Sequence, residues 1–242
     1  MQQIISPSRF EKNELKPHLN KYWCIPPDKN AEFVAAMEDV LDVYLRPENE
    51  SRPLVCLDEA SKQLISETRP SLPCKSGSIK KVDAEYRRNG TASIFMMNVP
   101  LKGKRYVRVR DQRRREDFAE VIRELCDEIY PHAKKIILVL DNLNTHNTAS
   151  LYQTFKPEEA KRLADKLEIH YTPRHGSWLN MAEIELSILS RQCMKDYFET
   201  REQLAEATAA WERSRNDISA GINWRFTTAD ARIKLKRLYP TI

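Results

Sequence analysis

The segment that most constrains the fold of this chain is residues 136–146, Ile-Ile-Leu-Val-Leu-Asp-Asn-Leu-Asn-Thr-His. Its five consecutive apolar residues lack the alternation of a strand with one wet face. They therefore predict a short strand buried on both faces, as in the middle of a parallel sheet. The run stops at Asp141, at the carboxyl end of the strand, where open α/β sheets bind ligands. A single Asp at such a place more often only begins a loop or caps a helix.

A second segment has the same pattern, because the apolar residues 54–57 run directly into Asp58 and Glu59. The remaining periodicity predicts a first helix over 31–45, capped by Asn30 or Asp28, and a helix opened by the capping box Thr200–Gln203. Between these two helices it predicts strands over 92–99, 105–110 and 168–171 and helices over 115–129 and 157–166. Residues 66–90 are predicted to form a long irregular connection that ends in a turn at Asn89-Gly90. The order of elements predicts an α/β protein with a mixed sheet covered by helices.

The composition, with 41% apolar and 31% charged residues, is ordinary for a soluble protein. The sequence has neither an apolar run of membrane-spanning length nor a signal peptide at its start, so we expect a cytoplasmic protein. Five scattered cysteines, without any Cys-x-x-Cys pair, favour reduced thiols over disulfides or a zinc site.

The basic residues are unevenly distributed, although the net charge is only +5. One block holds Lys102, Lys104, Arg105, Arg108, Arg110, Arg113, Arg114 and Arg115. Such a block suits the phosphate backbone of a nucleic acid. A strand and loop that simply expose these charges to solvent would explain the block equally well.

A third acidic position lies on a helix predicted to begin at Ser177 and to run to about residue 196. Its apolar stripe is Leu179, Ala182, Leu186, Leu189 and Cys193. At 100° per residue, Glu183 falls on one flank of that stripe with Asn180, and Glu185 falls on the other flank. Both flanks border the core, so geometry leaves both acids open. The polar flank favours Glu183, although an acid on a helix flank is most often simply solvated.

Three carboxylates from distant segments are what phosphodiester chemistry requires. Two divalent ions about 4 Å apart can activate an oxygen nucleophile and stabilise both the transition state and the leaving oxygen. Mg²⁺ prefers oxygen ligands and keeps several waters, so a few Asp and Glu side chains suffice to hold it.

The segments that carry these acids resemble the catalytic domain of DDE transposases, in the bacterial insertion-sequence branch related to the mariner elements. Residues 55–59, 138–146 and 171–183 carry the resemblance, which extends from about residue 20 to the end of the chain. It implies a ribonuclease-H-like mixed five-stranded sheet with helices on both faces. We expect an arm and helix over 1–50, a catalytic core over 51–198 and a C-terminal helical extension over 199–242.

The resemblance implies that Asp58, Asp141 and Glu183 bind two Mg²⁺ or Mn²⁺ ions. It also implies a two-step reaction in which water cuts DNA at the element ends and the freed 3′-hydroxyl then attacks target DNA. Candidates for supporting the site or for contacting DNA are Glu59, Asn142, His146, Asn180, Lys102, Lys104, Arg105, Arg113 and Arg114. For His146, contact with DNA or a site water and a purely loop-stabilising hydrogen bond are equally open.

Transposases of this kind usually carry helix-turn-helix units ahead of the catalytic domain, but only about fifty residues precede Asp58. We therefore expect the catalytic half of an element split over two reading frames, or a truncated copy. The expected partners are DNA, a second copy of the chain and a separate helix-turn-helix polypeptide. Two alternatives are a ribonuclease-H-like nuclease that cuts without joining and an inactive DNA-binding remnant.

Overall fold

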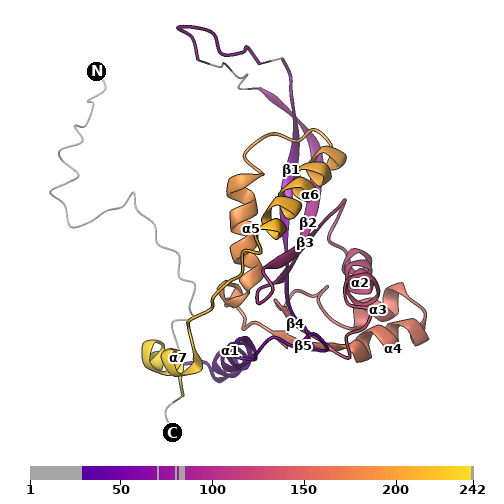
Figure 1. The fold of residues 1–242 in the computed structure, drawn as a ribbon, viewed down its shortest axis with the longest axis vertical. Helices are drawn as coiled ribbons and strands as arrows, with labels where there is room; N and C mark the ends of the chain where they lie inside the picture. Colours follow the sequence, from indigo (N-terminus) through magenta and orange to yellow (C-terminus); the bar gives the residue numbers. More distant parts are fainter. Residues whose placement is uncertain (1–28, 70, 80, 82–84, 241–242) are drawn as a thin grey trace, which may run out of the picture.

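A five-stranded mixed sheet forms the centre of the computed structural model, which describes residues 29–69, 71–79, 81 and 85–240 (Figure 1). In spatial order its strands are β3 (Lys104–Arg110), β2 (Tyr86–Val99), β1 (Leu54–Glu67), β4 (Ile136–Leu140) and β5 (Leu167–Tyr171). Strands β1, β2 and β3 pair antiparallel, whereas β4 pairs parallel with both β1 and β5. The predicted mixed sheet is thus confirmed, and β4 has the predicted bounds.

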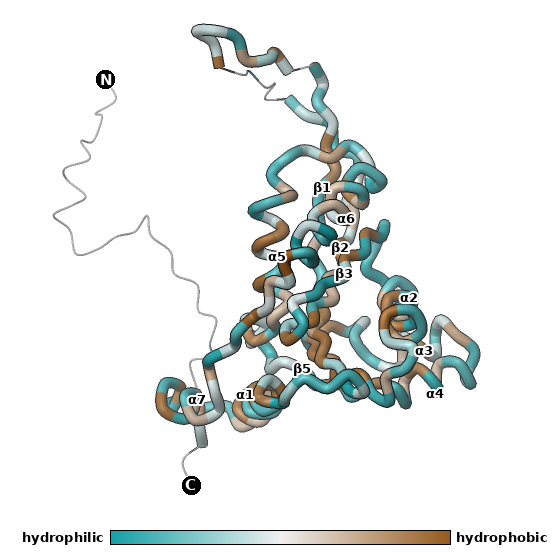
Figure 2. Tube along the Cα trace, viewed as in Figure 1, coloured by the Kyte–Doolittle hydropathy of each residue, from teal (hydrophilic) through white to brown (hydrophobic). Residues whose placement is uncertain are grey.

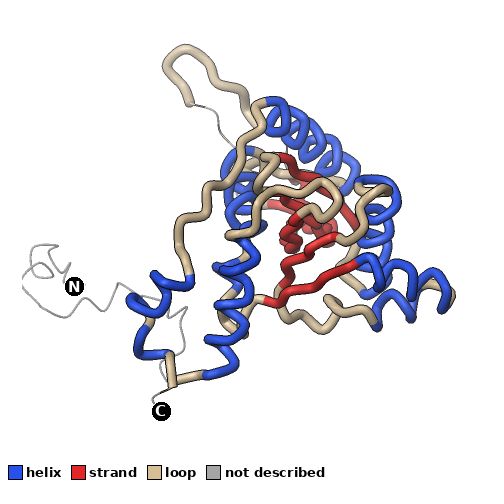
Figure 3. Tube along the Cα trace, turned by 60° about the horizontal axis from the view of Figure 1, so that its bottom comes forward, coloured by secondary structure: helices blue, strands red, loops and turns tan. Residues whose placement is uncertain are grey.

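Helices cover both faces of this sheet (Figures 1 and 3). On one face lie α2 (Arg115–Glu124, continued by a π-helical turn over Leu125–Ile129), α3 (Ala149–Thr154) and α4 (Pro157–Lys166). On the other lie α1 (Ala31–Tyr44), α5 (Met181–Gln192), α6 (Arg201–Asp217) and α7 (Thr228–Lys234), with 3₁₀ turns at Ser177–Leu179 and Lys236–Leu238.

Burial on both faces explains why the central strands read as unbroken apolar runs. Along β4, Ile137 and Val139 pack into the core beneath α1 and α5, while Leu138 and Leu140 pack into the core beneath α2 and α4. Figure 2 shows the same concentration of apolar residues along the middle of the sheet. No helix in the described part of the chain combines the length and apolarity needed to span a membrane.

The prediction for residues 66–90 was partly wrong, because β1 continues to Glu67 and β2 already begins at Tyr86. The two strands form a long hairpin that projects beyond the helices (Figure 1). Asn89 and Gly90 do not form a turn but lie inside β2, where the pairing with β1 shifts register and Gly90 has a φ of +93°. Some bulges, like some turns, place a glycine at positive φ, so the glycine alone did not distinguish the two.

Several helix boundaries follow from capping side chains that the sequence revealed. Asn30 begins α1 by accepting a hydrogen bond from the backbone N of Phe33 at 2.9 Å. Thr200 and Gln203 form the predicted capping box of α6. Helix α3 was not predicted, and the predicted N-terminal arm, like the alternative cap Asp28, lies outside the described residues.

Helix α6 and the segment after it cover β3, the edge strand of the sheet. The Asn216 side chain accepts from the backbone N of Arg105 at 2.9 Å and donates to its carbonyl at 2.8 Å. Beyond α6, the backbone N of Ile222 donates to the carbonyl of Pro100 in the turn between β2 and β3. These bonds satisfy edge groups that would otherwise be open to another strand.

Gly103 makes this docking possible, and its replacement tests it. It has a φ of +61°, and an added Cβ would overlap the carbonyl of Ser219 and lie 2.7 Å from the backbone N of Gly221. We expect Gly103→Ala to destabilise the fold by at least about 3 kcal/mol in urea unfolding, because strain and overlap add. Gly90→Ala is the matched control: it shares the positive φ but meets no atom within 4 Å, so only a strain cost of about 1 kcal/mol is expected. Equal losses in the two variants would contradict the docking role.

Candidate active site

Asp58 lies in the buried part of β1, where the strand approaches the start of α5. One of its carboxylate oxygens accepts a hydrogen bond from the backbone N of Glu59 at 2.8 Å. Burial raises the pKa of Asp58 to about 7; the hydrogen bond opposes this rise, and the negative charges of Asp141, Glu183 and Glu59 add to it. The three acids predicted from separate segments therefore share one electrostatic environment.

Asp141 follows the last residue of β4 and is held by its own loop. Its Oδ1 accepts from the backbone N of Leu143 at 3.2 Å and from Nδ1 of His146 at 2.5 Å. Burial acts to raise the pKa of Asp141, but the hydrogen bond and the charge of His146 outweigh it, with a smaller contribution from Arg113, and the pKa is lowered. The two neighbouring acids are thus shifted in opposite directions, with the pKa of Asp141 lowered and that of Asp58 raised.

The His146 side chain is fully buried, so it makes no surface for DNA in this structure. Its Nδ1 contacts Asp141, and its Nε2 lies 2.6 Å from Oε1 of Glu59. Burial lowers the pKa of His146, but the hydrogen bonds to the two carboxylates outweigh this effect and raise it to about 9. The ring packs against Phe118, with ring centres 4.9 Å apart.

Helix α5 is anchored at its first residue by Asn180. The Asn180 side chain accepts from the backbone N of Ala182 at 3.1 Å and donates to the carbonyl of Leu57 at 2.9 Å. It therefore caps α5 and ties it to β1 one residue before Asp58. Ser177 was predicted as the cap but instead begins a 3₁₀ turn, and α5 ends at Gln192 rather than near residue 196. Glu183 lies in the first turn of α5, half-buried.

Glu185, the other acid that the sequence left open, has a different environment. It is fully buried, and its carboxylate lies 3.2 Å from Nε of Arg105 and 3.2 Å from a guanidinium nitrogen of Arg215. Arg105 also donates to the carbonyls of Arg215 and Ala220. Arg105, predicted either to support the site or to contact DNA, is thus an interior residue with no surface for DNA, and Glu185 balances its charge.

The other basic residues of the block 102–115 differ in their surroundings. Lys102 lies 3.4 Å from Glu48, and Lys104 donates to the carbonyl of Asn216 at 2.8 Å. Arg113 and Arg114 are exposed in the connection between β3 and α2. Of these residues, Arg113 acts on Asp141 electrostatically and helps to lower its pKa.

An open groove begins at Asp141 and runs toward the start of α1. It is lined by Asp141, Asn142, Leu143, Thr172, Pro173, Arg174, His175 and Ser177, and it continues along Asn30, Glu32, Phe33 and Ala36. Asn142 is exposed there and donates to the carbonyl of Thr172 at 2.5 Å. Sequence reasoning did not single out Arg174 and His175. The positive φ of His175, +62°, is a strained conformation that no sequence pattern signalled.

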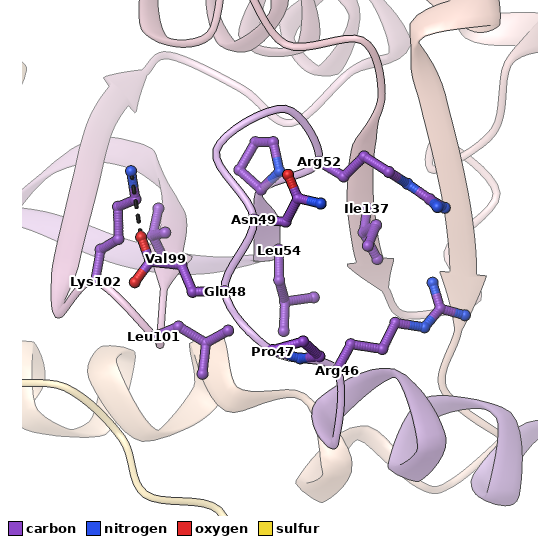
Figure 4. Close-up of a pocket in the computed structure, with 11 residues that line it drawn as sticks. Arg46, Pro47, Glu48, Asn49, Arg52, Leu54, Val99, Leu101, Lys102 and Ile137 are labelled. Carbon is purple, nitrogen blue, oxygen red and sulfur yellow. Dashed lines mark ion pairs between the residues drawn. The ribbon is translucent and has the colours of Figure 1, made fainter.

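A second, much smaller pocket lies at the opposite ends of the strands (Figure 4). It is lined by Arg46, Pro47, Glu48, Asn49, Arg52, Pro53, Leu54, Val99, Leu101, Lys102 and Ile137. Leu54 and Ile137 stand at the amino ends of β1 and β4, whereas Asp141 follows the carboxyl end of β4. This pocket is therefore separate from the cluster of acids.

The donor chemistry of the acids fits a hard divalent cation. Among the described residues, no group of three His, Cys, Asp or Glu side chains is arranged so that it could hold a metal ion as it stands. Asp58, Asp141 and Glu183 nevertheless offer only carboxylate oxygens, and their mutual repulsion contributes to the raised pKa of Asp58. A bound Mg²⁺ or Mn²⁺ ion would relieve that repulsion.

Comparisons with known proteins identify the family and the fold of the chain. The sequence profile of a family described as DDE superfamily endonuclease matches residues 53–205. No curated protein sequence gives a match. A similar fold occurs in the crystal structure of the Mos1 mariner paired end complex with Mn, with a TM-score of 0.56, 13% identity and coverage of 88% of this chain and 64% of that chain. The crystal structure of the Mos1 Strand Transfer Complex is also similar, with a TM-score of 0.57, 13% identity and coverage of 87% of this chain and 62% of that chain.

A Mos1 transposase paired-end complex with the left transposon end is also similar, with a TM-score of 0.57, 13% identity and coverage of 94% of this chain and 67% of that chain. At these identities the likeness concerns the fold, and the predicted ribonuclease-H-like fold is confirmed. The chain spans 62% to 67% of the length of these three chains.

Paired substitutions on α5 test the different environments of its two acids. Glu185→Gln leaves the buried Arg105 charge without its counter-charge, so we expect a loss of about 2–4 kcal/mol in urea unfolding without metal. Glu183→Gln removes a charge that repels Asp58, so stability should change by less than about 0.5 kcal/mol or rise slightly. The reverse order of the two effects would contradict this assignment.

Proposed function

This chain belongs to the DDE superfamily of endonucleases, and from that premise we propose that it is the catalytic part of an insertion-sequence transposase. It cuts DNA at element ends and joins the resulting 3′-hydroxyl to target DNA. The observation that supports this most directly is the shared electrostatic environment of Asp58, Asp141 and Glu183, which come from β1, the loop after β4 and the first turn of α5.

In this proposal, Asp58, Asp141 and Glu183 hold two Mg²⁺ or Mn²⁺ ions. When bound, such ions supply positive charge to the phosphate oxygens of the reacting phosphodiester. Cleavage adds a water oxygen to phosphorus and releases the 3′-oxygen as a hydroxyl. Joining adds that hydroxyl to a target phosphodiester and releases another 3′-hydroxyl. Because both reactions exchange one oxygen for another at phosphorus, one set of carboxylates can serve both.

The protein groups around the acids would bind and orient the DNA. Arg113, which acts on Asp141, and the neighbouring Arg114 are exposed and can neutralise phosphates without reading sequence. The groove from Asp141 past Arg174 offers a path for a strand leaving the acids. Asn180 keeps α5 against β1, so that Glu183 stays near Asp58.

We further propose that recognition of the element ends requires other protein parts. The chain spans less than two thirds of two of the Mos1 chains to which it is similar. A helix-turn-helix polypeptide would supply base readout, and a second copy of the chain would hold the second element end. Residues 1–50 would link the catalytic core to that recognition unit.

Substitution of each acid tests the catalytic assignment. Asp58→Asn, Asp141→Asn and Glu183→Gln should each lower Mn²⁺-dependent nicking of supercoiled plasmid by at least about 10²-fold, the scale of removing an aligned electrostatic stabiliser. Asp165→Asn is the control, because Asp165 is an exposed carboxylate on α4 paired with Lys161. Joining is assayed separately with DNA that already carries free 3′-hydroxyl ends. Nicking without any joined product would favour the nuclease alternative.

Metal addition tests the charge cluster without any DNA. Saturating Mn²⁺ at about 100 times its dissociation constant should stabilise the wild-type fold by about 2.7 kcal/mol, which corresponds to a rise in Tm of roughly 5–10 °C for a chain of this size. EDTA should reverse the rise, and Asp58→Asn and Asp141→Asn should largely abolish it. A wild-type Tm that does not respond to Mn²⁺ would argue for an inactive remnant.

A further inference from the structure

We propose that Glu59 and His146 are positioning residues that fix the orientation of the Asp141 carboxylate before any metal ion binds. This inference rests on the proposed function, because it concerns how one of the proposed metal ligands is held. It starts from a chain of two short contacts, Glu59 to His146 at 2.6 Å and His146 to Asp141 at 2.5 Å.

The two contacts connect the acid-bearing strands from one side of the sheet. Successive residues of a strand point to opposite faces. Leu57 packs into the core beneath α2 and α4, and Cys56 packs into the core beneath α1 and α5. By the same alternation Glu59 faces α2, where Phe118 contacts His146, and Asp58 faces α5, which carries Glu183. His146 therefore reaches Asp141 from the face opposite to the other two acids, where it does not compete with them for a cation.

The two oxygens of the Asp141 carboxylate differ in their hydrogen bonds. Its Oδ1 accepts from the ring of His146 and from the backbone N of Leu143. None of the hydrogen bonds between described residues reaches its Oδ2. Two donors on one oxygen fix the rotation of the carboxylate and leave the other oxygen available as a ligand. Donors of this kind commonly orient metal-binding side chains in proteins.

The His146 ring can act in this way because it is itself fixed. The hydroxyl of Tyr171 donates to the His146 carbonyl at 2.8 Å, and the backbone N of His146 donates to the carbonyl of Leu143 at 2.9 Å. Ser150 donates to the carbonyl of Thr145 at 2.7 Å. Nε2 of the ring lies against Glu59 and Nδ1 lies against Asp141, so a carboxylate holds the ring at each nitrogen. Glu59 therefore keeps the ring turned with Nδ1 toward Asp141.

A second histidine in the same chain provides a matched comparison. His170 on β5 also lies between two carboxylates, with Nδ1 2.7 Å from Asp39 and Nε2 3.3 Å from Glu168. It connects β5 to α1 and contacts none of the proposed metal ligands. A merely structural role for His146 predicts that the two histidines behave alike, whereas a positioning role predicts that only His146 affects metal binding.

The test measures Mn²⁺ binding to the full chain by calorimetry, without DNA, together with Tm. His146→Phe keeps a ring against Phe118 but removes both hydrogen bonds, so Mn²⁺ affinity should fall by about 10–100-fold. His170→Phe should leave the affinity unchanged, whatever it does to Tm. Unchanged Mn²⁺ affinity in a folded His146→Phe variant would overturn the proposal.

Two variants of Glu59 keep the test decisive if His146→Phe does not fold. Glu59→Gln retains an oxygen that accepts from Nε2 of His146, whereas Glu59→Ala removes it. Glu59→Ala should weaken Mn²⁺ binding by about 10-fold, and Glu59→Gln should recover most of that loss. Equal losses in these two variants would overturn the positioning role and leave the proposed function intact. A wild-type chain that binds no Mn²⁺ would instead contradict the proposed function, and this inference with it.

Discussion

Carboxylates crowded at one edge of a doubly covered sheet are the constraint on which the rest of this structure depends. Asp141, Glu183 and Glu59 each repel the charge of Asp58 there, and burial makes that repulsion costly. On the side of α2 that repulsion is balanced by His146, which lies between Glu59 and Asp141. For Asp58, on the side of α5, the charged residues of the described chain that act most strongly are all acids, and the pKa of Asp58 is raised. The protein is thus left with excess negative charge on the face where a divalent ion would act.

The orientation of α5 depends on polar anchors at two places. Asn180 attaches its first turn to the carbonyl of Leu57, and Glu185 attaches its next turn to Arg105 and Arg215. A buried ion pair adds little net stability, because desolvation offsets most of the attraction, but an arrangement that separated the two charges would leave each of them buried without a partner. With Glu185 turned toward β3 and α6, Glu183 must lie on the opposite flank. Helix α6, outside the segment predicted as the catalytic core, therefore helps to place a proposed catalytic acid.

The predictions that succeeded were those that local sequence determines. The apolar run before Asp141 can be satisfied only in a strand buried on both faces, and the capping side chains of Asn30 and Thr200 act within four residues. The misassigned positions depend on partners distant in sequence. Asn180 rather than Ser177 caps α5 because its amide also reaches Leu57, and Arg105 is interior because Glu185 meets it there. Local pattern showed a basic block but could not show which of its charges were neutralised by α6.

The division of roles between Asp58 and Glu59 follows from strand geometry alone. Two adjacent acids on a helix would lie about 100° apart and share much of their surroundings. In a strand they are directed to opposite faces, so Asp58 meets α5 while Glu59 meets the loop that holds His146. Because β1 and β4 are parallel neighbours, the end of β4 brings Asp141 within reach of both faces. One pair of consecutive residues can thereby supply a metal ligand on one side of the sheet and an anchor for the neighbouring ligand on the other.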